Sequence, residues 1–194
     1  MLRRFIGNKV ETILSKIARP LLKFKISPNV LTFTGLVINI FAAYFFYKGL
    51  FLPAGIVVVF AGFFDMLDGA VARTGGVETA FGSFLDSVVD RYSDFLIFGG
   101  VLVHFCKRGD LKVTLVVLTI LAGSFLTSYA RARAELIIEK CAVGLMERSE
   151  RIILLAAGAI FGFLDLALWL LAFLTNLTAF YRIWYTYKTI RTRS

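Results

Sequence analysis

Six apolar stretches, separated by short polar segments, dominate this sequence of 194 residues, of which 58% are hydrophobic. The stretches occupy residues 30–47, 50–72, 85–105, 113–131, 152–164 and 167–187. A helix needs about 20 mostly apolar residues to cross the hydrocarbon core of a bilayer, so only the fifth stretch requires neighbouring residues to span it. Because the stretches take up almost the whole chain, we expect one all-α polytopic membrane domain over residues 1–194. Residues 28–194 would form its bundle of six transmembrane helices.

The first 27 residues differ from the rest because their apolar side chains recur at steps of three and four. Leu14, Ile17, Ala18 and Leu21 show this period, which extends back to Leu2. The spacing predicts an amphipathic juxtamembrane helix with Arg and Lys on its other face. We expect residues 1–27 to lie on the inner membrane surface. A helix packed against the bundle is a compatible alternative.

The net charge of +9 is concentrated at three places along the chain. Basic residues gather before the first apolar stretch, between the fourth and fifth stretches, and at the C-terminal end. The positive-inside rule therefore predicts a protein of the inner membrane whose termini both face the cytoplasm. An even number of spans agrees with this, because it places both termini on the same side. Anionic lipid headgroups, and not nucleic acid, are the expected counter-charge.

Four aspartates interrupt the second and third stretches: Asp65, Asp68, Asp86 and Asp90. Carboxylates are costly near lipid, so intramembrane acids indicate a functional site. The spacings of three and four residues put each pair on one helix face, and a short link makes the two helices an antiparallel hairpin. Four converging carboxylates repel one another unless cations bind between them. Oxygen ligands favour Mg²⁺, Mn²⁺ or Ca²⁺ over zinc.

Small residues accompany the acids, and an arginine follows the first pair. Gly69, Ala72 and Gly82 keep one wall free of bulk, although glycine destabilises a helix by roughly 1 kcal/mol relative to alanine. Arg73 adds a planar guanidinium suited to a phosphate oxygen. The combination predicts a nucleotide-diphosphate site. In a purely structural alternative, the acids pair with Arg73 and Arg91, but two bases leave a surplus of negative charge.

The pattern D-x-x-D-G-x-x-A-R, followed after eight residues by G-x-x-x-D-x-x-x-D, resembles the signature of the CDP-alcohol phosphotransferases at every fixed position. The resemblance implies that an acceptor hydroxyl attacks the lipid-side phosphorus of a CDP-activated donor and that CMP leaves. It implies two divalent cations, Mg²⁺ or Mn²⁺, held by the four aspartates, with Asp90 also the general base. It further implies a homodimer. The residues implied to bind the CDP-lipid are Asn29, Thr32, Gly69, Ala72, Arg73, Thr79 and Gly82.

Two arginine-containing segments, 128–135 and 144–151, resemble those of the phosphatidylinositol-phosphate synthase branch of this family. That branch uses myo-inositol 1-phosphate as the acceptor. The resemblance implies that Arg131, Arg133 and Arg151 grip the acceptor phosphate, with Arg148 in the same segment and Arg182 as a further candidate. Arg131 stands where many relatives have lysine, which leaves the exact acceptor open.

Several alternatives remain open. The acceptor can be another phosphorylated alcohol, such as the glycerol 3-phosphate of phosphatidylglycerophosphate synthases, or CDP-inositol can be the donor. The donor lipid can be diacyl or archaeal. In a different functional class, the acids would line a divalent-cation channel or carrier, but this leaves the glycines and arginines unexplained.

Overall fold

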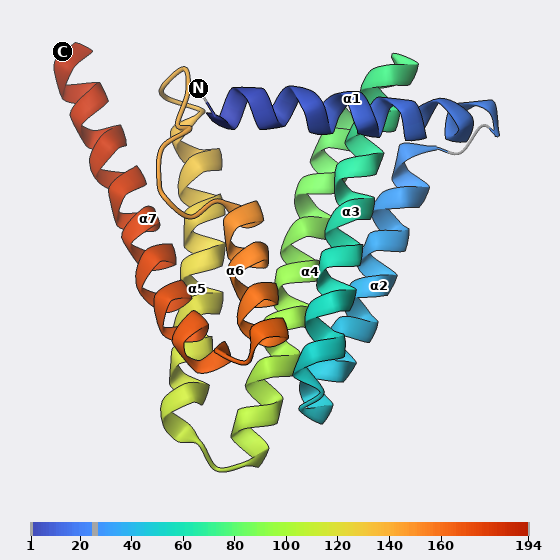
Figure 1. The fold of residues 1–194 in the computed structure, drawn as a ribbon. Coiled ribbons are helices and arrows are strands. Elements are labelled where there is room, and N and C mark those ends of the chain that lie inside the picture. The colour runs from blue at the N-terminus through green and yellow to red at the C-terminus, as the bar shows by residue number, and fades with distance from the viewer. Residues whose placement is uncertain (1, 25–26, 194) are drawn as a thin grey trace.

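The computed structural model of the protein describes residues 2–24 and 27–193, with side chains for residues 13–24 and 27–192. Over this part of the chain it contains seven helices and no strand, which confirms the all-α fold class (Figure 1). The helices are α1 (Leu2–Lys23), α2 (Pro28–Lys48), α3 (Phe51–Gly75), α4 (Ala80–Lys107), α5 (Leu111–Ala134), α6 (Arg148–Phe161) and α7 (Leu164–Arg193).

Helices α2 to α7 run along a common direction, and α1 lies across one end of this bundle (Figure 1). The C-terminal end of α7 lies at the same end as α1. Leu14 and Ala18 of α1 are buried in a cluster with Leu67 and Val71 of α3. The N-terminal helix therefore packs against the bundle. The part of its predicted apolar face before residue 13 lies outside the described side chains.

Four of the described helices are long and apolar enough to cross a membrane: α2, α3, α5 and α7. Helix α4 has the length but carries the charged residues Asp86, Asp90, Arg91 and Asp94. Helix α6 has 14 residues and is therefore about 21 Å long, shorter than a hydrocarbon core of about 30 Å. The protein is thus a membrane protein with several apolar helices.

Two helices begin before the apolar stretches from which they were expected, and both starts concern the site. Helix α4 begins at Ala80, so Gly82 lies in its first turn and not in the link between the helices. Thr79 caps this helix by accepting a hydrogen bond from the Gly82 N–H at 2.9 Å. Helix α6 begins at Arg148, four residues before the predicted start of the fifth apolar stretch. Arg148 is therefore held by a helix.

Glycines let neighbouring helices approach closely enough to bring the site together. A Cβ atom on Gly55 of α3 would lie 2.9 Å from the Ala156 carbonyl oxygen of α6. A Cβ atom on Gly100 of α4 would clash with the backbone of Ala43 in α2. Small residues at such crossings are typical of packed membrane helices. The α3–α6 contact matters most, because these antiparallel helices carry Asp65 and Arg148 toward the same end.

Candidate active site

Three of the four predicted aspartates converge between α3 and α4. Asp65, Asp86 and Asp90 each offer a carboxylate oxygen, and these oxygens lie within 4.8 Å of one another. Asp86 and Asp90 share a face because they are one helical turn apart. An all-oxygen donor set of this kind suits a hard divalent cation such as Mg²⁺ or Mn²⁺. The residues present therefore fit a divalent-metal site.

The fourth aspartate, Asp68, faces α2 and is not one of the three that converge. Its carboxylate accepts a hydrogen bond from the Thr32 hydroxyl over 2.5 Å. Asp68 is 5% exposed, yet it is close enough to Asp65 and Asp86 for the charges to repel. The helical turn that separates Asp68 from Asp65 thus places it at the edge of the cluster, oriented by Thr32.

Arg148 extends from the first residue of α6 into the acid cluster. Its Nη1 atom lies 2.8 Å from Asp65 Oδ2 and also contacts Asp90 Oδ1. Arg91 lies 3.3 Å from Asp90 on the same helix. The acids are therefore partly neutralised by arginine, but the arginine in contact with two of them comes from α6 and not from the motif itself.

Sequence reasoning missed Asp94, which lies one turn beyond Asp90 on α4. Its Oδ2 atom is 2.7 Å from Arg151 Nη2, and its Oδ1 atom is 3.5 Å from Arg148 Nε. Asp94 is 6% exposed and Arg151 is 2% exposed, so the pair is buried. The signal was present in the sequence, because Asp86, Asp90 and Asp94 repeat at four-residue intervals.

The residues predicted to bind the donor form two separate groups. A Cβ atom on Gly82 would lie 3.0 Å from Thr79 Oγ1 and 3.6 Å from Asn29 Oδ1, so these three residues are neighbours. The Arg73 guanidinium folds back over Gly69, where a Cβ atom would lie 3.0 Å from Nη1. The structure brings together residues 29, 79 and 82, and separately residues 69 and 73. Ala72 lies in the last turns of α3, between Gly69 and its C-terminal cap.

The predicted acceptor arginines differ in their surroundings. Arg131 forms an ion pair with Glu135 at 3.0 Å. Arg182 is buried and donates to the backbone carbonyls of Thr127 at 2.8 Å and Val143 at 2.9 Å. Arg133 is exposed and is not among the residues that line the cavity beside the acids. Four of the five arginines thus face this cavity, and Arg133 does not.

That cavity has a volume of about 1530 Å³ and joins a charged end to an apolar wall. Asp65, Asp90, Arg131, Arg148, Arg151 and Arg182 line the charged end. Phe84, Phe95 and Phe125 contribute to the apolar wall. A cavity with both surfaces suits a ligand with an anionic headgroup and a hydrocarbon tail.

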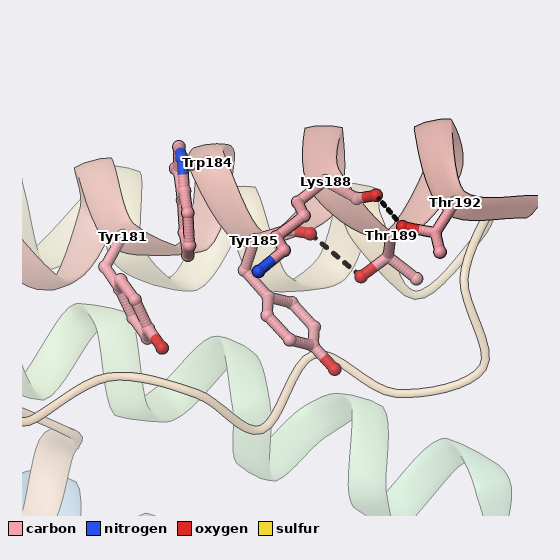
Figure 2. Close-up of a pocket in the computed structure, with 6 residues that line it drawn as sticks. All are labelled: Tyr181, Trp184, Tyr185, Lys188, Thr189 and Thr192. Atoms are coloured by element: carbon pink, nitrogen blue, oxygen red, sulfur yellow. Dashed lines mark hydrogen bonds between the residues drawn. The ribbon is translucent and has the colours of Figure 1, made fainter.

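A second depression, of about 470 Å³, follows the C-terminal part of α7 (Figure 2). Tyr181 and Trp184 stack with ring centroids 5.7 Å apart, and Lys188 Nζ lies 5.2 Å from the Trp184 ring centre. The residues that line it come from α7 and include no carboxylate. Aromatic and lysine side chains at the end of a membrane helix are typical of the lipid–water interface.

The fold and the site define a membrane protein with an acid cluster that fits a divalent metal and a cavity that fits a lipid. Residues 25–185 match the family model of CDP-alcohol phosphatidyltransferase. The chain belongs to this family and is a phospholipid-synthesising transferase of that class.

Relatives with named activities align over most of the chain. Archaetidylinositol phosphate synthase from Pyrococcus horikoshii is 37% identical over 186 residues, which are 95% of this chain and 96% of that protein. Phosphatidylinositol phosphate synthase from Mycobacterium marinum is 38% identical over 187 residues, which are 89% of this chain and 80% of that protein. The archaeal and bacterial relatives thus have similar levels of identity.

Solved structures agree with the fold. Crystal structures of Mycobacterium tuberculosis phosphatidylinositol phosphate synthase are 34% identical to this chain. The structure with CDP-DAG bound has a TM-score of 0.83 and covers 91% of this chain and 94% of its own. The structure in complex with manganese and citrate has a TM-score of 0.83 and covers 90% of this chain and 88% of its own.

Proposed function

We propose that this enzyme transfers a phosphatidyl or archaetidyl group from a CDP-activated lipid to myo-inositol 1-phosphate and releases CMP. The observation that carries the proposal is the cavity that joins the acid cluster to four arginines and an apolar wall. The acids suit divalent cations, which in turn bind a pyrophosphate. The arginines suit a second phosphate, and the apolar wall suits a lipid tail. A relative with CDP-DAG bound and relatives named for inositol phosphate products support this assignment.

Two Mg²⁺ ions per protomer, or Mn²⁺ in their place, are proposed to bind Asp65, Asp68, Asp86 and Asp90. The convergence of three of these carboxylates supports the assignment, as does the manganese complex of the M. tuberculosis relative. Such ions neutralise a pyrophosphate and stabilise the departing phosphate. Asp68 would join the other three while its second oxygen still accepts from Thr32.

The donor's cytidine and phosphates are proposed to bind where α2, α3 and α4 meet. Gly69, Ala72 and Gly82 would leave room for the ring, and Arg73 would contact a phosphate oxygen. Asn29, Thr32 and Thr79 would contribute polar contacts from the neighbouring helix ends. The closeness of Gly82 to Asn29 and Thr79 supports a shared pocket.

The transfer is proposed to begin when Asp90 removes the proton of the acceptor hydroxyl. The hydroxyl oxygen then forms a bond to the lipid-side phosphorus, and the bond from that phosphorus to the bridging oxygen breaks. CMP leaves with the electron pair of the broken bond. Asp90 suits this role because it lies at the junction of the acid cluster and the arginines, in contact with Arg148.

The acceptor phosphate is proposed to bind Arg131, Arg148, Arg151 and Arg182, with Arg133 at the entrance from the aqueous side. A guanidinium group can donate two parallel hydrogen bonds to the oxygens of one phosphate, which suits arginine to phosphate binding. An arginine in contact with two of the acids also weighs against a divalent-cation channel. Glycerol 3-phosphate is the alternative acceptor, and CDP-inositol the alternative donor for the same chemistry.

The membrane arrangement is proposed to comprise one domain over residues 1–194, with α2 to α7 crossing the inner membrane and α1 on its cytoplasmic surface. Helix α6 would reach across with the segments that flank it. Both termini and the active site would face the cytoplasm, as the basic residues suggest. The enzyme is proposed to act as a homodimer.

An acceptor panel tests the proposal. Purified protein is assayed for CMP release from CDP-diacylglycerol and from its archaeal ether counterpart, each with inositol 1-phosphate or glycerol 3-phosphate. Release should require both Mg²⁺ and inositol 1-phosphate, and Asp90→Asn should abolish it without altering thermal unfolding. Equal release with glycerol 3-phosphate would contradict the acceptor, and full activity of Asp90→Asn would contradict the base.

A further inference from the structure

Asp94 is a buried carboxylate for which the proposed chemistry has no use. It lies on α4 one turn beyond Asp90, and a turn advances the helix by about 5.4 Å. Asp65, Asp86 and Asp90 converge on one another, whereas both oxygens of Asp94 face arginines of α6. One stripe of α4 therefore carries Asp86 and Asp90, which belong to the acid cluster, and Asp94, which lies outside it and contacts two arginines.

The contact with Arg151 is the shorter of the two. Asp94 Oδ2 lies 2.7 Å from Arg151 Nη2, and the two residues are 57 positions apart in the sequence. Arg151 is 2% exposed, and a buried guanidinium without a counter-ion is strongly destabilising. The contact therefore fixes the position of the Arg151 guanidinium relative to α4.

The contact of Asp94 with Arg148 is longer, and it involves a different nitrogen of the Arg148 guanidinium from the one that contacts the acid cluster. Arg148 Nε lies 3.5 Å from Asp94 Oδ1, while Nη1 is directed at Asp65 and Asp90. Asp94 thus lies between two guanidinium groups that both line the cavity. One carboxylate holds both arginines and also lowers their mutual repulsion.

We propose that Asp94 is a positioning residue that sets the affinity for the acceptor's phosphate by holding Arg151, and with it Arg148, at the charged end of the cavity. The inference rests on the proposed function, in which these arginines bind that phosphate. A guanidinium fixed in advance loses less conformational entropy on binding than a free one. Asp94 does not touch the reacting atoms, so its loss weakens acceptor binding and spares the donor.

The test is a comparison of Michaelis constants for the wild type and Asp94→Asn. The asparagine has the same shape without the charge, and the acceptor KM should rise roughly tenfold or more, as expected for the loss of a charged hydrogen bond. The donor KM and the dissociation constant for Mn²⁺ should stay at their wild-type values. The inhibition constant of inorganic phosphate, as a competitive inhibitor against the acceptor, should rise by a similar factor. A general loosening of the fold does not produce this parallel change.

Val101→Ala is the matched control, because Val101 is fully buried in the same helix two turns further on. It should lower the unfolding temperature and leave the acceptor KM unchanged. A rise in acceptor KM with Val101→Ala equal to that with Asp94→Asn would overturn the inference.

A double-mutant cycle with Arg151→Gln asks whether Asp94 acts through Arg151. In the Arg151→Gln background, adding Asp94→Asn should raise the acceptor KM by a smaller factor than Asp94→Asn does in the wild type. The two effects are not additive because the residues interact. Full additivity would overturn the inference. If Asp94→Asn does not fold, Asp94→Glu keeps the charge but displaces it by one methylene, and an unchanged acceptor KM would overturn the inference.

The wild-type arm separates the two possible failures. Wild-type protein that releases no CMP with the acceptor contradicts the proposed function. Wild-type activity combined with a normal acceptor KM in Asp94→Asn contradicts the role of Asp94 alone.

Discussion

Thr32 on α2 donates a hydrogen bond to a carboxylate oxygen of Asp68 on α3, with the two oxygen atoms 2.5 Å apart. The two residues are 36 positions apart in the sequence and both are buried. The bond joins the entry of the first apolar helix to the aspartate motif. A threonine outside the motif is thus in direct contact with one of the acids within it.

Thr32→Val should lower both stability and donor affinity. The valine has nearly the same shape but leaves the buried Asp68 carboxylate without its hydroxyl partner, which costs about 1–3 kcal/mol. Thermal unfolding in detergent and the KM for the CDP-lipid measure the two effects. Thr34→Val is the control, because Thr34 donates to the Val30 carbonyl of its own helix and should be neutral. Equal effects of the two substitutions would contradict the prediction.

Arg148→Gln should strengthen metal binding while it weakens turnover. The Arg148 charge lies against Asp65 and Asp90 and competes with a divalent cation for the same carboxylates. A unit charge about 4 Å away is worth up to about 4 kcal/mol at an effective dielectric of about 20, so Mn²⁺ affinity should rise at least about tenfold. Titration of Mn²⁺ by electron paramagnetic resonance measures this. Weaker Mn²⁺ binding would show that Arg148 supports the site.

Gly82→Ala should raise the KM for the CDP-lipid and leave the acceptor KM unchanged. The new methyl group would lie 3.0 Å from Thr79 Oγ1 and 3.6 Å from Asn29 Oδ1, where it narrows the predicted donor pocket. Gly99→Ala is a control on the same helix, since nothing lies within 4 Å of its Cβ position. That control should raise the unfolding temperature slightly, because alanine favours a helix by roughly 1 kcal/mol over glycine.

Glu135 should make a small pH-dependent contribution to stability. Burial alone would raise its pKa, but hydrogen bonds from Arg131 and the Cys141 N–H and the nearby positive charges hold the pKa below its ordinary value. A carboxylate whose pKa is lower in the folded state stabilises the fold at pH values above its unfolded-state pKa. This stabilisation is lost as the pH falls through the folded-state pKa. The difference in unfolding temperature between wild type and Glu135→Gln should therefore be present at neutral pH and vanish in acid. A difference that grows in acid would contradict the ion pair.

Much of the fold followed from local pattern. The lengths of the apolar stretches predicted the helices, and the three- and four-residue steps put Asp86 and Asp90 on one face. These inferences hold because a helix repeats every 3.6 residues whatever it packs against. The spacing also contained Asp94, which continues the same stripe, but it did not reveal its partners. The partners lie on α6, far along the chain.

Other features of the site depended on how helices pack. The sequence alone predicted Arg148 to lie with the acceptor arginines, and the structure directs it into the acid cluster as well. It predicted that all four aspartates converge, and the structure turns Asp68 toward Thr32. Arg182 binds backbone carbonyls of Thr127 and Val143, which no pattern of residues indicates.

The sequence by itself determined that this chain forms apolar helices, that its acids share helix faces, and that it belongs to a family of lipid-synthesising transferases. Only the tertiary structure decided which acids meet, which arginines neutralise them, and how α6 faces α3 and α4. The physical reason is that helical period assigns each side chain to a face, whereas the opposing face depends on close packing between distant segments. The approach of Gly55 to Ala156 is one such contact, and it brings Arg148 to Asp65.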